Sequence, residues 1–284
     1  MPKVLKYMQL DYELLDSGNQ QKWERFGNNT IIRPEARAVW LPGLCQWPAN
    51  AQGKHQEKGS YTWHQEASWQ EPWLIKMDSL CFELHLSQSK NIGIFPEQMK
   101  NWQWLSHVIQ SSKKPNPRVL NLFAYTGGAT LVAASAGAEV CHVDASKSTV
   151  RWASRNADLS HLADKSIRWI ADDAMQFLKR EIKRGVFYDG IILDPPPVGH
   201  GAKGIFTFKN NVDQLLSLCK QALAPKPLFF LFNCYAMNYT HLMAKELVAS
   251  VFKQENLKSA ELFVQETCRK KQISCSVYVR CSAF

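Results

Sequence analysis

The sequence predicts an α/β protein with a doubly wound, mostly parallel sheet, an antiparallel last strand, and a small β-rich domain ahead of the sheet. Three observations carry this prediction. From residue 118 onward, apolar runs of strand length alternate with helical patterns, as in sheets built from β–α–β units. The last two runs are joined by a short polar segment that leaves no room for a helix. The composition of the chain also changes near residue 105.

The first part of the chain accounts for the small β-rich domain. Eight of the ten tryptophans lie before residue 105, among short alternating runs such as "PWLIKM" and "LCFELHL". We expect these tryptophans to form core, because a small domain needs large side chains to bury enough area. The polar segment 48–60 is expected to be a mobile loop. The domains are therefore expected at 1–105 and 106–284.

Seven strands are expected in the second domain, with helical patterns filling the first five gaps between them. Their expected positions are 118–124, 139–143, 166–170, 188–193, 227–233, 258–265 and 273–281. The connection "QETCRKKQ" is too short for a helix, so the last two strands should form an antiparallel hairpin. Ligands of such sheets bind at the carboxyl ends of the strands, where the strand order reverses.

Composition excludes several classes of protein. No run of about 18 apolar residues could span a bilayer, and the N-terminus has no apolar segment followed by a small-residue cleavage site. We therefore expect a soluble, cytoplasmic protein without a membrane partner. The eight cysteines show no CxxC pair and no Cys/His ligand spacing, which argues against a zinc site and a disulfide scaffold.

The net charge of +9 comes from the second domain. Residues 1–105 hold 11 Lys+Arg and 11 Asp+Glu, whereas 106–284 hold 23 and 14. An excess of this kind suits a nucleic-acid partner, although solvated helix and loop faces are the alternative. The two basic clusters are Lys179, Arg180, Lys183, Arg184 and Arg269, Lys270, Lys271.

The turn after the first strand of this domain differs from a dinucleotide site. It reads Tyr125-Thr126-Gly127-Gly128, without the third glycine of a GxGxxG pyrophosphate cradle. Asp144 ends the second strand and can accept hydrogen bonds from ribose hydroxyls. Together these features favour a nucleoside with a non-phosphate tail, such as S-adenosylmethionine. The alternative is a packing glycine pair beside a solvated aspartate.

Two aspartates follow the third strand directly. From this position a carboxylate can accept a hydrogen bond from the amino group of an adenine. We favour Asp173 for this role, with Asp172 as the alternative. An aspartate here can also simply cap the next helix.

The fourth strand runs into Asp194-Pro195-Pro196-Pro197. Prolines hold an extended loop rigid, so we expect Asp194 to be fixed at the strand end beside the ligand. The alternative is a plain turn that stops the strand.

The fifth strand ends on Asn233-Cys234-Tyr235, next to the fourth strand in a doubly wound sheet. We therefore expect Cys234 to face the cleft that Asp194 lines. A cysteine there can add to carbon 6 of a pyrimidine and allow methyl transfer to carbon 5. The alternative is a small buried packing residue.

Five segments together resemble a known family. In order and spacing they resemble the class I S-adenosylmethionine-dependent methyltransferases related to the bacterial 23S ribosomal RNA cytosine-carbon-5 methyltransferases. The resemblance covers roughly residues 91–284. It implies a Rossmann-like seven-stranded sheet, S-adenosylmethionine as cofactor, and RNA, ribosomal RNA in particular, as partner. The segments are "NIGIFPEQMKNW", "VLNLFAYTGGATL", "CHVDASKSTVRWASRNA", "ADDAMQFL" and "YDGIILDPPP".

The resemblance also implies roles for individual residues around the cofactor and the acceptor base. The residues that would wrap the methionine end are Phe123, Tyr125, Thr126 and Gly127. The residues that would hold or flank the ribose are Asp144, Ala145 and Ser146, and Asp173 would hold the adenine amino group. Asp194 and Pro196 would line the methyl-transfer pocket, and Cys234 sits where the cytosine enzymes place their nucleophile.

Two positions depart from the pattern of that family. Pro197 stands where a lysine often follows the two prolines, and Asn233-Cys234-Tyr235 replaces the more usual Ser-Cys-Ser. The leading hypothesis is an RNA methyltransferase that acts on ribosomal RNA, with cytosine carbon 5 as a candidate acceptor. The alternatives are nitrogen methylation on RNA or on a non-RNA substrate with Cys234 idle, and a non-catalytic RNA-binding protein. A nicotinamide dehydrogenase is disfavoured by the missing third glycine and by the proline loop.

Overall fold

The chain divides into two compact units. The computed structural model describes residues 8–56, 61–88, 90–201, 204–235, 239–253 and 256–282. The large unit contains Lys100–Leu262 and the chain from Ser276 onward, and the small unit contains the described residues of Lys6–Met99 and Phe263–Cys275. These bounds differ from the expected division at residue 105, which falls inside helix α1 (Met99–Ser111). The last segment of the small unit comes from the far end of the chain, which a single cut in the sequence cannot represent.

The large unit is built on a seven-stranded sheet. Its strands are β8 (Arg118–Leu122), β9 (Glu139–Asp144), β10 (Ile167–Ala171), β11 (Gly190–Leu193), β14 (Phe229–Cys234), β15 (Lys258–Gln265) and β16 (Gln272–Ser282). The strand order is β10-β9-β8-β11-β14-β16-β15. The four pairs from β10 to β14 are parallel, and β16 pairs antiparallel with β14. The predicted mostly parallel sheet with an antiparallel last strand is confirmed.

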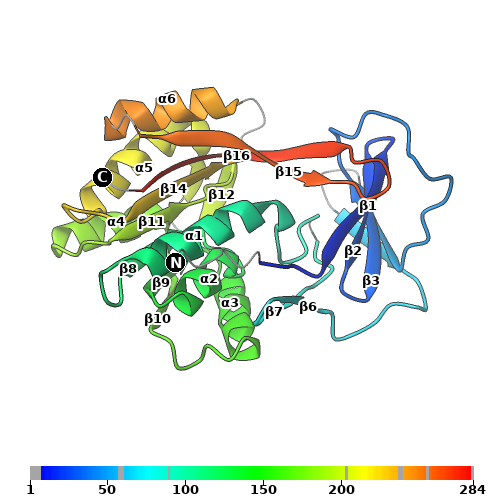
Figure 1. Cartoon of the computed structure of the whole chain (residues 1–284), viewed down its shortest axis with the longest axis horizontal. Helices are drawn as coiled ribbons and strands as arrows, with labels where there is room; N and C mark the ends of the chain where they lie inside the picture. Colours follow the sequence, from blue (N-terminus) through cyan, green and yellow to red (C-terminus); the bar gives the residue numbers. More distant parts are fainter. Residues whose placement is uncertain are drawn as a thin grey trace, which may run out of the picture. The chain divides into compact units, whose positions relative to one another are not determined.

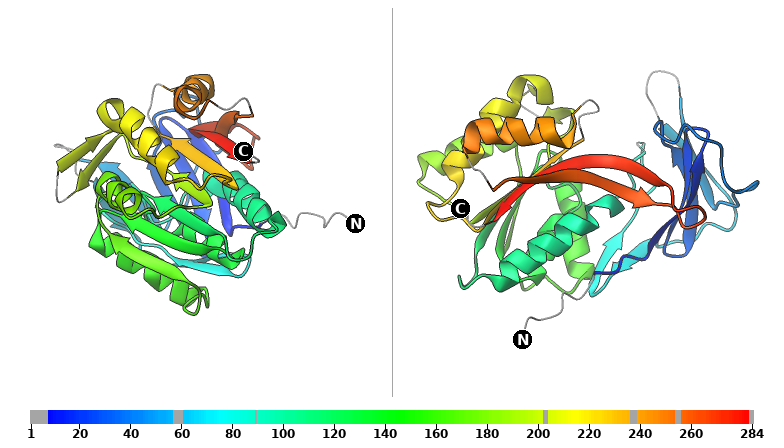
Figure 2. Two further views of the ribbon diagram at one scale, coloured as in Figure 1. Left: turned by 90° about the vertical axis from the view of Figure 1, so that its left-hand side faces the viewer. Right: turned by 45° about the horizontal axis from the view of Figure 1, so that its top comes forward.

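Helices cover both faces of this sheet (Figures 1 and 2). Helices α4, α5 and α6 lie on one face, and α1, α2 and α3 lie on the other. A large apolar cluster joins the sheet to α4, α5 and α6, since Phe230 and Phe232 of β14 pack in one cluster with Leu215 and Leu216 of α5. The bounds are α2 (Gly128–Ser135), α3 (Lys147–Leu159), α4 (Ala174–Lys183), α5 (Phe208–Ala222) and α6 (His241–Phe252). All five predicted gap-filling helices are present.

The hairpin β12–β13 and helix α1 were not predicted. Strands β12 (Val198–Gly201) and β13 (Gly204–Thr207) pair antiparallel directly after the proline run. Glycines at their ends mask the strand pattern in the sequence, because glycine weakens strand propensity. Helix α1 follows a short 3-10 turn, η2 (Pro96–Gln98), and buries Trp102, Leu105 and Ile109 at helical spacing.

The small unit confirms the predicted β-rich region. A five-stranded sheet runs in the order β1-β2-β3-β4-β5, and β6 and β7 form a separate pair. The bounds are β1 (Tyr12–Gly18), β2 (Gln21–Phe26), β3 (Asn29–Pro34), β4 (Ala51–His55), β5 (Tyr61–Gln65), β6 (Leu74–Met77) and β7 (Leu80–Glu83).

Two expectations for the small unit were wrong. Strand β4 occupies part of the segment 48–60, which was expected to be a loop, and the strand buries Ala51. Residues 57–60 of that segment lie outside the described residues. Of the eight tryptophans expected in the core, Trp73 of the small unit and Trp102 of the large unit are buried, and the other six are only partly buried. An indole can leave one edge in water while its remaining area packs, which explains this pattern.

An ion-pair cluster links distant segments within the small unit. Asp16, Glu266 and Cys268 lie close enough together to hold a metal ion. However, Arg269 Nη2 already lies 2.9 Å from Asp16 Oδ1 and 3.0 Å from Glu266 Oε1. The guanidinium therefore balances both buried carboxylates, and the cluster is a structural ion pair.

The helices of the described residues include none that is both long enough and apolar enough to cross a membrane.

The apolar cluster behind the sheet should control the stability of the large unit. Leu216 of α5 is 0% exposed and belongs to that cluster, so Leu216→Ala should lower the free energy of unfolding by about 2–5 kcal/mol. Leu242 of α6 is 62% exposed, and the same substitution there should change stability by about 0.5 kcal/mol or less. Urea denaturation of both variants measures the difference. Equal losses would mean that the cluster is not the main core.

Candidate functional site

The parallel register brings four loops to one edge of the large sheet. Leu122 of β8 pairs with both Val143 of β9 and Leu193 of β11, and Leu193 also pairs with Phe232 of β14. Ala171 of β10 pairs with Asp144. The strands therefore end at nearly the same level. The loops that begin at residues 123, 145, 172 and 194 leave from this edge, where the sequence predicts a ligand site.

The loop between β8 and α2 has an unusual backbone. Phe123, Tyr125 and Gly127 have φ angles of 56°, 49° and 89°, all in the left-handed region. For bulky residues such as Phe and Tyr this conformation is strained, and strain of this kind concentrates at functional sites. At Gly127 a Cβ atom would lie 3.0 Å from Leu131 Cδ1 and 3.2 Å from Ala153 Cβ, so the glycine also permits close packing. No pattern in the sequence indicates the strain at the two aromatic residues.

Asp144 holds this loop in place. Its Oδ2 accepts a hydrogen bond from Tyr125 N at 2.9 Å, and its Oδ1 accepts one from Ser146 N at 3.0 Å. Burial raises the pKa of Asp144, and these two backbone hydrogen bonds oppose the rise. A carboxylate has about four lone-pair positions, so each oxygen keeps capacity for a ligand hydroxyl. The Asp144 carboxylate can therefore hold the loop after β8 and bind a ribose at the same time.

The start of α3 lies next to Asp144. Ser146 is the N-cap of this helix, and its Oγ accepts a hydrogen bond from Thr149 N at 3.2 Å. Ala145 is exposed between Asp144 and the cap. The structure thus gives Ser146 a capping role, and its predicted contact with the ribose remains a prediction.

Both aspartates after β10 make local hydrogen bonds. Asp173 is the N-cap of α4 and accepts from Gln176 N at 2.9 Å, which is the alternative role considered for it from the sequence. Asp172 Oδ1 accepts from Asp173 N at 2.9 Å, and its Oδ2 pairs with Arg180. Asp172 N donates to Asp144 O at 3.0 Å, which fixes the loop beside the ribose candidate. Among the described residues Asp172 has more hydrogen-bond and ion-pair partners than Asp173, and the adenine contact of Asp173 stays a prediction.

The proline run connects Asp194 to the unpredicted hairpin. Asp194 N lies 3.4 Å from Leu122 O, which continues the ladder between β8 and β11 by one residue. Pro197 O accepts from Phe208 N at 2.9 Å, so the run is anchored at both ends. Asp194 and Pro196 are partly buried, as residues that line a site would be.

The hairpin β12–β13 brings apolar side chains to the loop after β8. The ring of Phe206 in β13 lies 5.2 Å from that of Phe123. Val198 and Ile205 of the same hairpin are 52% and 64% exposed. These two residues were missed from the sequence, although exposed apolar groups next to a strand-end site are suited to contact a substrate.

Cys234 lies in the apolar core, contrary to the expectation that it faces a cleft. The side chain is 2% exposed and belongs to the cluster that contains Phe230, Phe232 and Val248. Residues alternate between the faces of a strand, so Asn233 points to the opposite face. There Asn101 Nδ2 of α1 donates to Asn233 Oδ1 at 2.8 Å.

Several charges of the two basic clusters are already paired. Arg180 pairs with Asp172, and Arg184 Nη1 lies 3.1 Å from Glu181 Oε1. Arg269 balances the Asp16 and Glu266 carboxylates, and Lys271 Nζ lies 4.7 Å from the centre of the Trp40 ring. The exposed members are Lys179, Lys183, Arg184, Lys270 and Lys271.

Comparisons with known proteins agree with this geometry. Residues 46–247 match the family model described as S-adenosylmethionine-dependent methyltransferase. The crystal structure of the SAM-dependent methyltransferase from Agrobacterium tumefaciens is 35% identical in sequence, with a TM-score of 0.89, over 96% of this chain and 90% of that chain.

Two curated relatives are ribosomal RNA methyltransferases by name. Ribosomal RNA large subunit methyltransferase I from Aeromonas salmonicida is 27% identical over 176 residues, which is 62% of this chain and 43% of that protein. Ribosomal RNA large subunit methyltransferase K from Neisseria meningitidis serogroup B is 22% identical over 269 residues, 90% of this chain and 73% of that protein. The chain thus spans less than half the length of the first of these relatives.

Asp144→Ala should weaken S-adenosylmethionine binding by about 1.5–3 kcal/mol, because a charged hydrogen-bond acceptor for the ribose is lost. Titration calorimetry measures the affinity. Asp158→Ala, at an exposed position of α3, is the matched control and should leave the affinity unchanged. Unchanged affinity in a folded Asp144→Ala protein would place the ribose elsewhere.

The pH dependence of the same affinity provides a second control. Since burial raises the pKa of Asp144, its carboxylate takes up a proton at a higher pH than an ordinary aspartate does. The wild-type affinity should therefore fall as the pH decreases through this raised pKa. Asp144→Asn carries no titrating group at this position, so its affinity should stay flat over the same range.

Proposed function

Because the chain belongs to the S-adenosylmethionine-dependent methyltransferase family, we propose that it is an enzyme that transfers a methyl group from S-adenosylmethionine to a base of RNA, with ribosomal RNA as the preferred substrate. The observation that carries this proposal is the strand-end edge, where Asp144, the strained loop and Asp194 lie on adjacent strands. The names of the two curated relatives support RNA as the substrate class. The expected cytoplasmic location stays a prediction.

The residues at this edge suit the cofactor. The strained loop would surround the methionine end through Phe123, Tyr125, Thr126 and Gly127, and Asp144, Ala145 and Ser146 would hold the ribose. Asp173, or Asp172 in its place, would accept the adenine amino group, and Asp194 with Pro196 would line the pocket around the methyl group. When bound, S-adenosylmethionine supplies an electrophilic methyl group.

The burial of Cys234 bears on which atom of the base accepts that methyl group. Methylation of cytosine carbon 5 needs a thiolate that reaches carbon 6, and buried structural cysteines are inert. Cys234 is 2% exposed in an apolar cluster, which favours a packing role. We therefore infer a base nitrogen as the acceptor. The Asp194 carboxylate would accept a hydrogen bond from that nitrogen and take the proton that leaves it.

Asp194→Ala should lower the rate of methyl incorporation into ribosomal RNA by at least about a hundredfold, because the group that takes the proton is lost. Incorporation is measured with labelled S-adenosylmethionine and purified RNA. The matched control is Asp213→Ala at an exposed position of α5, which should keep the wild-type rate. If wild type binds RNA but no methyl group is incorporated, the protein is a non-catalytic RNA-binding protein.

RNA binding by wild type should fall steeply between about 50 and 200 mM salt, because phosphate contacts release counterions. A flat response would favour a small-molecule or protein substrate.

Cys234→Ala should retain methyl transfer at a comparable rate, since this side chain packs in the apolar cluster behind the sheet. Cys234→Ser adds a polar hydroxyl to an apolar site and should reduce stability more than activity. Rates on natural RNA, together with thermal melting of both variants, separate the two effects.

The opposite outcome would restore carbon-5 chemistry. If a folded Cys234→Ala protein binds S-adenosylmethionine normally but transfers no methyl group, Cys234 is the nucleophile. Wild type should then also form a covalent complex with RNA that contains 5-fluorocytidine, because fluorine blocks the elimination step.

A further inference from the structure

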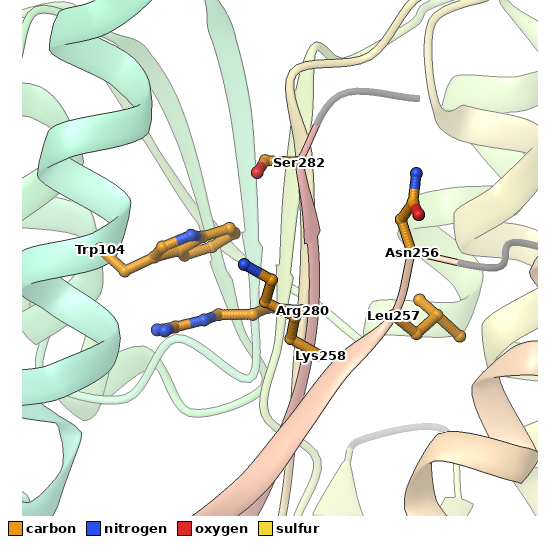
Figure 3. A pocket seen from close by; sticks show the side chains of 6 residues that line it. All are labelled: Trp104, Asn256, Leu257, Lys258, Arg280 and Ser282. Atoms are coloured by element: carbon orange, nitrogen blue, oxygen red, sulfur yellow. The ribbon is translucent and has the colours of Figure 1, made fainter.

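A polar cavity of about 480 Å³ lies in the large unit, away from the strand-end edge. Its lining comes from α1, from the segment that leads into β15, and from β15 and β16. Figure 3 shows the Trp104 ring and the Arg280 side chain next to each other, with Lys258 beside Arg280. The lining residues are Trp104, Asn256, Leu257, Lys258, Arg280 and Ser282.

Arg280 has an unusual environment for a partly buried arginine. Its guanidinium lies 5.0 Å from the centre of the Trp104 ring and 4.7 Å from that of Tyr278. No ion pair among the described residues includes Arg280, and its buried Nε has no hydrogen-bond partner there. Nη1 makes one long contact, 3.5 Å from Lys100 O. Burial lowers the pKa of this guanidinium, and Tyr278 is the group that opposes the change.

This arrangement leaves the hydrogen-bonding edge of the guanidinium available. Aromatic rings attract a guanidinium through its faces, whereas its five N–H donors point outward in the plane. An arginine that stacks on aromatic rings can therefore donate two hydrogen bonds to an oxyanion without first breaking an ion pair with a carboxylate. The exposed Lys258 adds a second positive charge, and Ser282 and Asn256 add a hydroxyl and an amide. This combination of groups suits a phosphate.

The position of the cavity relates it to the methyl-transfer edge. Arg280 pairs with Leu231 of β14, and Tyr278 pairs with Asn233, one residue before the end of that strand. At about 3.3 Å per residue, Leu231 lies roughly 10 Å from the strand end at Cys234. A stacked nucleic-acid strand rises about 3.4 Å per nucleotide, so roughly three nucleotides cover this separation. A polymer can thus reach both places at once.

We propose that Arg280 and Lys258 bind a backbone phosphate of the substrate RNA, a few nucleotides from the methylated base. This inference rests on the proposed function, because it assumes an RNA substrate. The site would hold the RNA strand against the α1 face of the sheet while the target base occupies the strand-end edge.

The test compares Arg280→Gln with wild type in RNA binding at several salt concentrations. The variant should bind ribosomal RNA about tenfold or more weakly, and its plot of log affinity against log salt should lose about 0.7–0.9 of slope, the share of one phosphate. The KM for RNA should rise while kcat at saturating RNA and the affinity for S-adenosylmethionine stay unchanged. Arg280→Lys keeps the charge but loses the fork, so its affinity should lie between the two.

Two further variants keep the test decisive. Lys165→Gln, at an exposed position before β10, removes one positive charge elsewhere and should keep the wild-type affinity and slope within about twofold. Lys258→Gln leaves the ring stack intact, so it tests the same cavity if Arg280→Gln fails to fold. It should also weaken RNA binding and reduce the slope.

Three outcomes would overturn the proposal. Unchanged RNA affinity and slope in folded Arg280→Gln and Lys258→Gln proteins would make the stack purely structural. If inorganic phosphate binds wild type but not Arg280→Gln, while RNA binding is equal in the two, the cavity takes a free phosphate instead. If Lys165→Gln has the same effect as Arg280→Gln, the loss reflects overall charge. Failure of wild type to bind any RNA would instead count against the proposed function, and phosphate titration would still report on the cavity.

Discussion

The register of the parallel strands is the constraint on which the site depends. Leu122 pairs with Val143 on one side and with Leu193 on the other, so β8, β9 and β11 end together. Backbone hydrogen bonding alone then delivers the loop after β8, Asp144 and Asp194 to one edge. Asp144 adds the specific tie, because it accepts hydrogen bonds from both the strained loop and the start of α3. Displacing either neighbouring strand by one residue would move these groups apart and turn their side chains to the other face.

Most of the fold of the large unit could be predicted, because its signals are local. Buried parallel strands are continuous apolar runs, and each run was found within two residues of its bounds. The hairpin β12–β13 was missed because glycines hide its alternation. The left-handed backbone at Phe123 and Tyr125 was missed for a different reason, since aromatic residues do not favour positive φ and only the surrounding packing imposes it. The edge at which these strands end could be predicted from the sequence, but the strained backbone there could not.

Cys234 and the basic clusters show what residue type alone leaves open. Cys234 shares the period-2 alternation of Phe230 and Phe232, and that pattern already placed it on their face of the strand. The reactivity of a thiol at a strand end had instead suggested that Cys234 faces the cleft. The structure shows that the side chain packs in the apolar cluster. A count of basic residues likewise does not show which charges are paired in the fold. Arg180 pairs with Asp172, and Arg184 pairs with Glu181, so both charges are partly compensated. The net charge of a surface depends on such pairs, which the count of basic residues does not include.

Two arginines in the last part of the chain illustrate how surroundings assign a role. Arg269 lies within hydrogen-bond distance of two buried carboxylates, so its donors are used and its loss would leave two uncompensated charges. Arg280 has aromatic rings in place of carboxylates, and its buried Nε has no partner among the described residues. Burying a cation without a compensating anion costs free energy and destabilises the folded protein. The cost is offset when an external anion completes the site, so the same physical argument that makes Arg269 structural makes Arg280 a ligand-binding residue.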